Sequence, residues 1–212
     1  MPKISEQKRQ SRRQEILDAA LACFSEDGFH QTGMADIVRR SDMSHGAVYS
    51  YFPSKDAIIE ALADDRHARE AIINSATGGA GGPIPAVAAL VRAYARALAD
   101  PAEEPRRRVG VHGWAEALRN RRVRASVVEG IEVPRRLITE MIERAQREGS
   151  IAKDVNAEAV ARSLVALFQG FALQIVWQET VDIEACVSVV ERMLSGLAPA
   201  PERAKRRRIG KT

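Results

Sequence analysis

Aromatic residues and cysteines are scarce in this sequence, and each shortage excludes a class of protein. Aromatics make up 5% of the 212 residues while apolar residues make up 45%, so a core has to be built mainly from aliphatic side chains. That balance suits packed helices better than a sandwich of strands. The two cysteines, Cys23 and Cys186, lie in expected helices without metal-ligand spacing. They indicate reduced thiols in a reducing compartment rather than a disulfide scaffold.

The motifs of common enzyme chemistries are also lacking. The sequence has no nucleophile elbow, no metal motif and no phosphate-binding glycine loop beside a strand. The glycine run over residues 78–82 is not followed by Lys-Ser or Lys-Thr, and the histidines are scattered without paired acids. We therefore expect a protein that is not an enzyme and uses no metal or cofactor. A helical enzyme is the least favoured alternative.

Signals for secretion or membrane insertion are weak. Residues 1–14 are polar and charged, so they do not resemble a secretion signal. Residues 159–177 imitate a membrane span, but they contain Arg162, Gln169 and Gln174. Inserting an arginine at the centre of a membrane helix costs roughly 2.5–3.5 kcal/mol. We therefore expect a buried helix in a cytoplasmic protein that makes no membrane contact.

Positive charge is concentrated at the two ends of the chain. The net charge is +4 at pH 7, and residues 1–13 and 199–212 are rich in lysine and arginine, while the region between them is acidic overall. Basic ends on an acidic body favour contact with a polyanion. For residues 1–13 we expect an arm that contacts DNA phosphates. For residues 199–212 a disordered, solubilising tail is favoured.

Apolar residues recur with helical spacing along most of the chain, without strand-like alternation or internal repeats. Gly28 is expected to end the first helix, and Pro134 is expected to kink or split the helix that it interrupts. The glycine-rich segment 77–83 marks a domain boundary. Helices are expected at residues 12–26, 33–40, 44–52, 55–75, 84–98, 106–119, 121–148, 157–179 and 182–197.

The helix expected at residues 157–179 is apolar on nearly all sides. Such a helix must be covered on both sides, and one small domain offers a single core. We therefore expect a second subunit to supply the other cover, with helices 157–179 and 182–197 of each subunit forming a four-helix bundle in a homodimer. The residues expected at that interface are Val165, Leu167, Ala172, Val176, Val189 and Met193.

Residues 32–62 are the most informative stretch, because they predict two short helices, a tight turn between them and the start of a further helix. Ser44 is a suitable N-cap, since its hydroxyl accepts an early backbone N–H. Val48 and Phe52 lie four residues apart on an inward face, and the helix exposes polar and aromatic groups on its other side. A helix-turn-helix protein offers such a surface to the major groove of DNA.

The sequence resembles the tetracycline-repressor (TetR) family of bacterial transcription regulators, most strongly over residues 14–62. One specific spacing carries much of the resemblance: Tyr49-x-Tyr51-Phe52-x-Ser54-Lys55. The resemblance implies an all-α fold of about nine helices, with an N-terminal three-helix helix-turn-helix domain and a C-terminal helical ligand-binding and dimerisation domain. The expected boundaries are 1–55 for the basic arm and DNA-binding domain, 56–76 for a connecting helix, 77–198 for the C-terminal domain and 199–212 for the tail.

The resemblance also implies which residues contact double-stranded DNA. A histidine can donate or accept a hydrogen bond at a base edge, an alanine can meet a thymine methyl, and a lysine at a helix N-terminus lies where phosphate is attracted. The residues expected to face the groove are Gly33, Met34, His45, Gly46, Ala47 and Tyr49, and those expected to hold phosphates are Ser44, Tyr51 and Lys55. Two alternatives remain open: Tyr49 serves packing alone, or His45 is a solvated surface residue.

Two departures from the family pattern affect this surface. Gly33 stands where a threonine cap is usual, which weakens the cap by a few tenths of a kcal/mol. Ser41-Asp42-Met43 replaces the usual Ala-Gly-Val, and aspartate tolerates the left-handed turn that the glycine serves. The fold should survive both changes, while the base preference becomes hard to infer.

The C-terminal half offers candidates for a small-molecule site, because apolar walls with a few polar groups are what such sites need. The candidates are Tyr94, His112, Trp114, Phe168, Phe171, Gln174 and Trp177, and the alternative is that they simply fill the core. We therefore expect a homodimeric transcriptional regulator, a repressor released from a palindromic operator by an unidentified ligand. The runner-up is an architectural DNA-binding protein without ligand control, which a dry, fully packed C-terminal core would favour.

Overall fold

The computed structural model describes residues 6–63, 82–177 and 180–199, and every regular element in these ranges is helical. The expected all-α fold is confirmed, with nine α-helices and one short 3-10 turn over the described ranges. Residues 64–76 of the predicted connecting helix, most of the glycine-rich segment, residues 1–5 of the N-terminal basic arm and residues 200–212 of the basic tail lie outside them. The elements are α1 (Glu6–Gln31), α2 (Met34–Arg40), α3 (His45–Tyr51), α4 (Lys55–Ala63), α6 (Pro83–Ala99), η1 (Pro101–Glu103), α7 (Glu104–Glu116), α8 (Arg121–Arg147), α9 (Ala157–Val176) and α10 (Ile183–Ser195).

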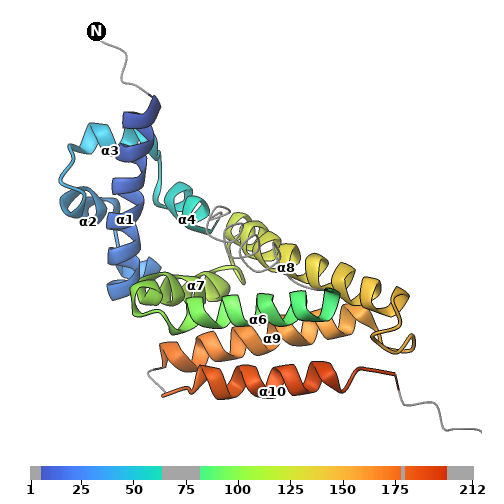
Figure 1. Cartoon of the computed structure of the whole chain (residues 1–212). Helices are drawn as coiled ribbons and strands as arrows, with labels where there is room; N and C mark the ends of the chain where they lie inside the picture. Colours follow the sequence, from blue (N-terminus) through green and yellow to red (C-terminus); the bar gives the residue numbers. More distant parts are fainter. Residues whose placement is uncertain (1–5, 64–81, 178–179, 200–212) are drawn as a thin grey trace, which may run out of the picture.

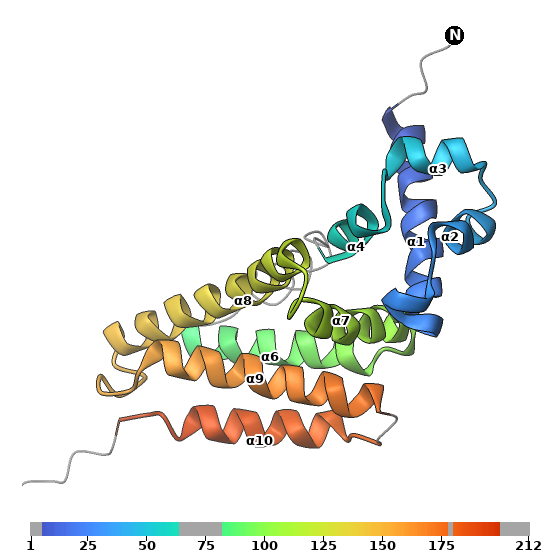
Figure 2. The same ribbon diagram turned by 180° about the vertical axis from the view of Figure 1, so that it is seen from behind.

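The helices form two groups that meet at α7 (Figures 1 and 2). The first three helices make the N-terminal group, and α6, α8, α9 and α10 make the larger C-terminal group. Helix α7 packs along α1 on one side and against α8 and α9 on the other. The N-terminal and C-terminal groups are therefore joined by lateral helix packing as well as by the chain itself.

Local sequence signals set most helix boundaries. The backbone N–H of Ala47 donates to the hydroxyl of Ser44 over 3.3 Å, which confirms Ser44 as the N-cap of α3. Asn156 and Asp182 cap α9 and α10 in the same way. Helix α1 begins at Glu6, earlier than the expected start at residue 12. The sequence did not indicate these first turns because they are exposed and have no apolar stripe. Hydrophobic periodicity alone cannot detect such a segment.

Gly28 ends the regular part of α1, as expected. Its φ of 73° lies in the left-handed region, which glycine adopts without steric cost, and the chain kinks there. Phe29 then folds back, so that its ring meets the Phe24 ring edge to face with centroids 4.9 Å apart. This contact buries both rings in the core of the N-terminal group.

Pro134 was expected to kink or split its helix, and the structure excludes the split, because α8 continues from Arg121 to Arg147. Proline removes one helical donor, so the carbonyl of Gly130, four residues earlier, lacks its usual N–H partner. Helix α8 tolerates that loss because it is 27 residues long and is held by packing against α4, α6 and α9.

Helices α9 and α10 leave apolar side chains uncovered in the single chain. Only Ala161 and Ala172 of α9 are buried, whereas Trp177 at its end and Val189 and Met193 of α10 are more than half exposed. Within the described ranges, α9 is the one helix long and apolar enough to cross a membrane. The core helix of a helical domain passes the same test, and α9 packs against α6, α7 and α8.

The same substitution at a buried and an exposed leucine tests the placement of the N-terminal core. Leu17 is 5% exposed and Leu118 is 85% exposed. Leu17→Ala should lower the free energy of unfolding by about 2–5 kcal/mol, because it removes buried methyl groups and leaves a cavity. Leu118→Ala should change it by no more than about 0.5 kcal/mol. Urea denaturation followed by circular dichroism measures both, and equal effects would contradict this placement.

Candidate DNA-binding surface and ligand cavity

Helix α3 has one buried face and one exposed face. Val48 is fully buried, and Phe52, just after the helix, is 3% exposed. His45 and Tyr49 lie on the opposite face and stack on each other, with ring centroids 4.4 Å apart and an interplanar angle of 24°. Gly46 lies beside them with open space where a side chain would be. The exposed face therefore presents a flat aromatic pair next to a position where another molecule can approach the backbone closely.

The turn between α2 and α3 takes the left-handed form that the sequence predicted. Asp42 has a φ of 52°, the one positive value at a residue other than glycine among the described residues. At the start of α2, the backbone N–H of Gly33 donates to the carboxylate of Asp36 over 2.8 Å. This bond, followed by the ion pair with Arg39, holds the pKa of Asp36 below its usual value. Asp36 thus stabilises the N-terminus of α2, where Gly33 lacks the hydroxyl of the threonine cap that is usual in the family.

The two arginines of α2 are occupied within the protein. Arg39 pairs with Asp36, and Arg40 makes a two-armed contact with Glu26 over 2.6 and 2.7 Å. The Arg40 guanidinium lowers the pKa of the Glu26 carboxyl. A phosphate would have to compete with these carboxylates, so neither arginine is a ready phosphate contact in the free protein.

Lys55 is also occupied, although its position suggested a phosphate contact. Its Nζ donates to the carbonyl oxygens of Phe29 over 2.6 Å and of Thr32 over 2.9 Å. An ammonium group has three N–H donors, so one is left for a phosphate. Lys55 therefore clamps the end of α1 to the start of α4. Met34 and Tyr51 likewise pack partly against the core beneath the surface, while Ala47 is half-buried and Ser44 is exposed.

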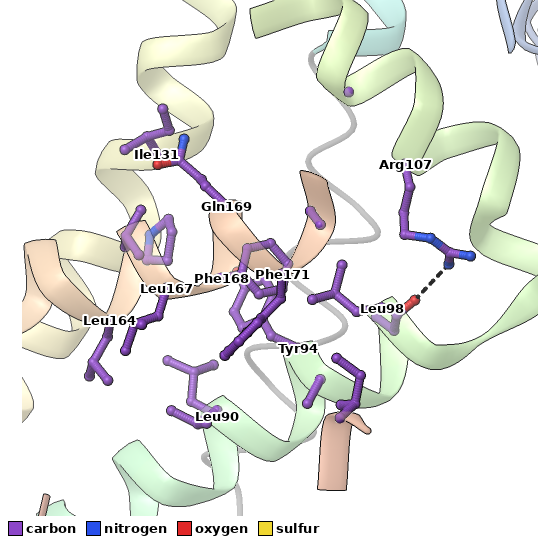
Figure 3. Close-up of a pocket in the computed structure, with 18 of the residues that line it drawn as sticks. Leu90, Tyr94, Leu98, Arg107, Ile131, Leu164, Leu167, Phe168, Gln169 and Phe171 are labelled. Atoms are coloured by element: carbon purple, nitrogen blue, oxygen red, sulfur yellow. Dashed lines mark hydrogen bonds between the residues drawn. The ribbon is translucent and has the colours of Figure 1, made fainter. Parts of the chain in front are cut away.

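A cavity of about 350 Å³ lies inside the C-terminal group, between α6, α7, α8, α9 and α10. Four of the seven expected ligand residues line it: Tyr94, Trp114, Phe168 and Phe171. The rings of Tyr94 and Phe168 meet nearly at right angles, with centroids 5.0 Å apart (Figure 3). The remaining walls are mainly aliphatic, from residues such as Leu90, Ile138 and Leu164. The alternative of a dry, fully packed C-terminal core does not fit this interior.

The other three expected ligand residues do not line this cavity. His112 lies on the opposite face of α7, where its ring is 6.0 Å from that of Phe29 and beside Gly28. Trp177 is 63% exposed at the end of α9. Gln174, one turn earlier, is half-buried but is not among the lining residues. Sequence reasoning placed them by residue type, whereas the direction of each side chain around its helix decides access.

Sequence reasoning missed the polar residues of the cavity wall. These are Glu103, Arg106, Arg107 and Gln169. Arg106 and Arg107 belong to a run of three arginines, which resembles a solvated charged face when it is read without the structure. Spacing offers one signal, because Arg107, Gly110 and Trp114 recur at helical intervals on the face of α7 that borders the cavity.

Both halves of the chain match families of known proteins. The family described as "Bacterial regulatory proteins, tetR family" matches residues 16–62. The family described as "BetI-type transcriptional repressor, C-terminal" matches residues 86–199, which is more than half of the chain. The chain belongs to the TetR family. This TetR-family protein is a DNA-binding transcriptional regulator, in agreement with the sequence prediction.

Individual relatives agree with this assignment. The HTH-type transcriptional regulator UidR of Escherichia coli strain K12 is 27% identical over 193 residues, covering 90% of this chain and 95% of UidR. The HTH-type transcriptional repressor Rv1474c of Mycobacterium tuberculosis is 38% identical over 78 residues, 37% of this chain and 42% of that protein. The solved structure of Salmonella enterica GusR has a TM-score of 0.71 at 29% identity, covering 92% of this chain and 98% of GusR.

The expected interface residues of this TetR-family protein fall into two groups. Val189 and Met193 are exposed, and Leu167 is 37% exposed, so a partner can reach them. Ala172 is 5% exposed and lines the cavity, so in the single chain it faces the protein's own interior, and its place at a subunit interface stays a prediction. Val165 also lines the cavity, and Val176 is half-buried. Apolarity around α9 does not reveal which face meets the protein's own core, and this is why the two groups were not separated.

Replacing Lys55 tests its role as a structural clamp. Lys55→Met should lower the free energy of unfolding of the DNA-free protein by about 1.5–3 kcal/mol, because the carbonyls of Phe29 and Thr32 lose a charged donor. Lys153→Met, at an exposed lysine in a loop, is the matched control and should have almost no effect. Chemical denaturation without DNA measures both. An unchanged denaturation midpoint for Lys55→Met would contradict the clamp role and leave DNA contact as the only role proposed for Lys55.

Proposed function

We propose that this protein is a homodimeric repressor that reads a palindromic operator and is released from it by a small molecule bound in the cavity. One observation carries the proposal: α7 contacts the DNA-binding group with one face and borders the cavity with the other. The C-terminal family and the relative Rv1474c are both described as transcriptional repressors. They support repression rather than activation.

The exposed face of α3 is proposed to enter the major groove. His45 and Tyr49 are preorganised by their stacking, so little side-chain entropy is lost when they meet the bases. Gly46 lets the helix approach closely because no side chain projects there. Ser44, Tyr51 and the third N–H of Lys55 are proposed to contact phosphates, which position the helix without reading sequence.

The uncovered apolar residues of α9 and α10 support a homodimer. Val189 and Met193 lie four residues apart on α10, so they occupy the same helix face. Leaving such side chains in water forgoes the free energy of burial, about 25 cal/mol per Å² of apolar surface. A second copy of the same two helices would cover them in a four-helix bundle. Dimerisation places two α3 helices for two half-sites of DNA.

Helix α7 is proposed to transmit ligand binding to the DNA-binding group. Trp114 and Arg107 face the cavity, whereas Val109 and Ala117 belong to the N-terminal core. A ligand that displaces α7 therefore also displaces α1. Helix α4, expected from the sequence to be the connector, is a second route because it packs against α1, α7 and α8. A ligand shifts the DNA equilibrium only if it binds the two conformations unequally, and coupling of about 1–3 kcal/mol is typical.

Selection of binding sites from a randomised DNA pool tests the DNA-binding part of the proposal. The wild type should select a palindrome with half-sites about one helical turn, roughly 34–36 Å, or a multiple of it apart. His45→Ala should change the selected sequence, because a good base contact discriminates by about 1–3 kcal/mol. Tyr51→Phe should weaken binding to all sequences alike. A selected profile that His45→Ala leaves untouched would remove His45 from the reading surface.

Sedimentation velocity tests the proposed dimer. Val189→Glu and Met193→Glu should each weaken the dimer severely, because a charge would be buried in the interface without a partner. Leu118→Glu is the matched control, since Leu118 is an exposed leucine in the α7–α8 connection rather than on α9 or α10, and it should leave the dimer intact. The proposal fails if the wild type sediments as a monomer at micromolar concentration.

A further inference from the structure

We propose that the cavity takes an apolar molecule with a single anionic group, specifically a carboxylate that pairs with Arg107. This inference rests on the proposed function, since it names the class of ligand for the same cavity. It is carried by the contrast between Arg107 and its two neighbours in the sequence.

Arg106 and Arg108 already have acidic partners, whereas Arg107 does not. Arg106 pairs with Glu103 over 3.5 Å and Arg108 with Glu104 over 3.0 Å. Arg106 and Glu103 line the cavity as an ion pair, and Arg107 lines it as well. Among the residues that the structure describes, no carboxylate lies within ion-pair distance of Arg107. The middle arginine thus brings a positive charge to the wall without an internal counter-charge.

The hydrogen bonds of Arg107 leave one edge of its guanidinium group available. Nη1 donates to the carbonyl oxygen of Asp100 over 2.7 Å and to that of Ala97 over 3.4 Å, and Figure 3 draws the bond to Ala97. Nε is shielded from solvent and has no hydrogen-bond partner. A shielded donor without a partner costs free energy. The two carbonyls hold Nη1, and a carboxylate can bind arginine through two parallel N–H···O bonds at the Nε edge if the side chain turns that edge toward the cavity.

The rest of the cavity favours an apolar ligand body. Its walls are dominated by aromatic and aliphatic side chains, including Trp114, Phe168 and Phe171. A volume of about 350 Å³ lies at the small end of the range for small-molecule pockets, about 300–1,000 Å³. A polyphosphate or a polyhydroxylated sugar would leave most of its polar groups without partners here. A cationic ligand would meet Arg107, while Glu103, the one acidic side chain among the described residues of the wall, is already paired with Arg106.

A second polar group lies across the cavity from Arg107. Figure 3 shows Gln169 of α9 on the other side of Phe168, near Ile131 of α8. The carbonyl of Gly130, also in the wall, lacks its helical donor because Pro134 has no N–H. A ligand with a hydroxyl, carbonyl or amide group at the end remote from its carboxylate can therefore be held at both ends.

Three probes with one apolar body and different head groups test the inference. Octanoate, octanamide and octylamine are titrated into the full-length wild-type protein by isothermal calorimetry. Octanoate should bind about 10–100-fold more tightly than octanamide, as expected for a hydrogen bond to a charged group, and octylamine should bind most weakly. Equal affinity for octanoate and octanamide, or no octanoate binding at millimolar concentration, would overturn the inference.

Variants assign the preference to Arg107. Arg107→Met should remove the advantage of octanoate over octanamide, whereas Arg107→Lys should retain most of it because the charge remains. Arg108→Met is the matched control, since Arg108 has an acidic partner and does not line the cavity. It should leave the preference unchanged. Circular dichroism checks that each variant is folded, and an octanoate preference that survives in folded Arg107→Met would contradict the assignment.

Titration of octanoate with and without selected DNA separates this inference from the proposed function. Linkage requires that DNA weaken octanoate binding by the same factor by which octanoate weakens DNA binding. Arg107-dependent octanoate binding with no effect of DNA supports the ligand class and contradicts ligand release. DNA binding without any octanoate binding contradicts the ligand class and leaves the DNA-binding regulator standing.

Discussion

The core of the N-terminal, DNA-binding group is completed by side chains of α7 and α8, and the remaining architecture depends on this packing. Val109 and Ala117 at α7, and Val123 of α8, are buried together with residues of α1 to α4. Burial of this shared apolar surface fixes the position of α7 against α1. Because α7 also forms a wall of the cavity, a shift of α7 changes both the cavity and its packing against α1. The two functional regions thus share helix α7, while the buried residues of the C-terminal group form clusters of their own.

Features that depend on a few neighbouring residues were predictable from the sequence. The cap at Ser44, the left-handed turn at Asp42 and the kink at Gly28 follow from local chemistry, and the structure has all three. Four aromatic residues of the cavity were also found, because large apolar side chains in the middle of helices tend to line an interior. The DNA-binding and dimer roles of individual residues remain predictions.

Features that depend on packing between distant segments were not predictable. His112 and Trp114 are two residues apart on α7, so they point in different directions, and sequence alone does not say which one meets the cavity. Lys55 lies where a phosphate contact is expected, but the fold brings the carbonyls of Phe29 and Thr32 to it. Arg107 was missed because its difference from Arg106 and Arg108 arises from rotation around the helix and from the positions of two glutamates.

The placement of the two tryptophans gives this protein two intrinsic optical probes, one on α7 and one at the end of α9. Trp114 is half-buried in the cavity wall, whereas Trp177 is 63% exposed at the end of that helix. Indole emission depends on the polarity around the ring, so the two side chains report from a half-buried position in the cavity wall and from a solvent-exposed one. Replacing Trp177 with phenylalanine leaves Trp114 as the single tryptophan, in the same cavity wall as Arg107 and the aromatic cluster. Occupancy of the interior can then be followed in real time without a label.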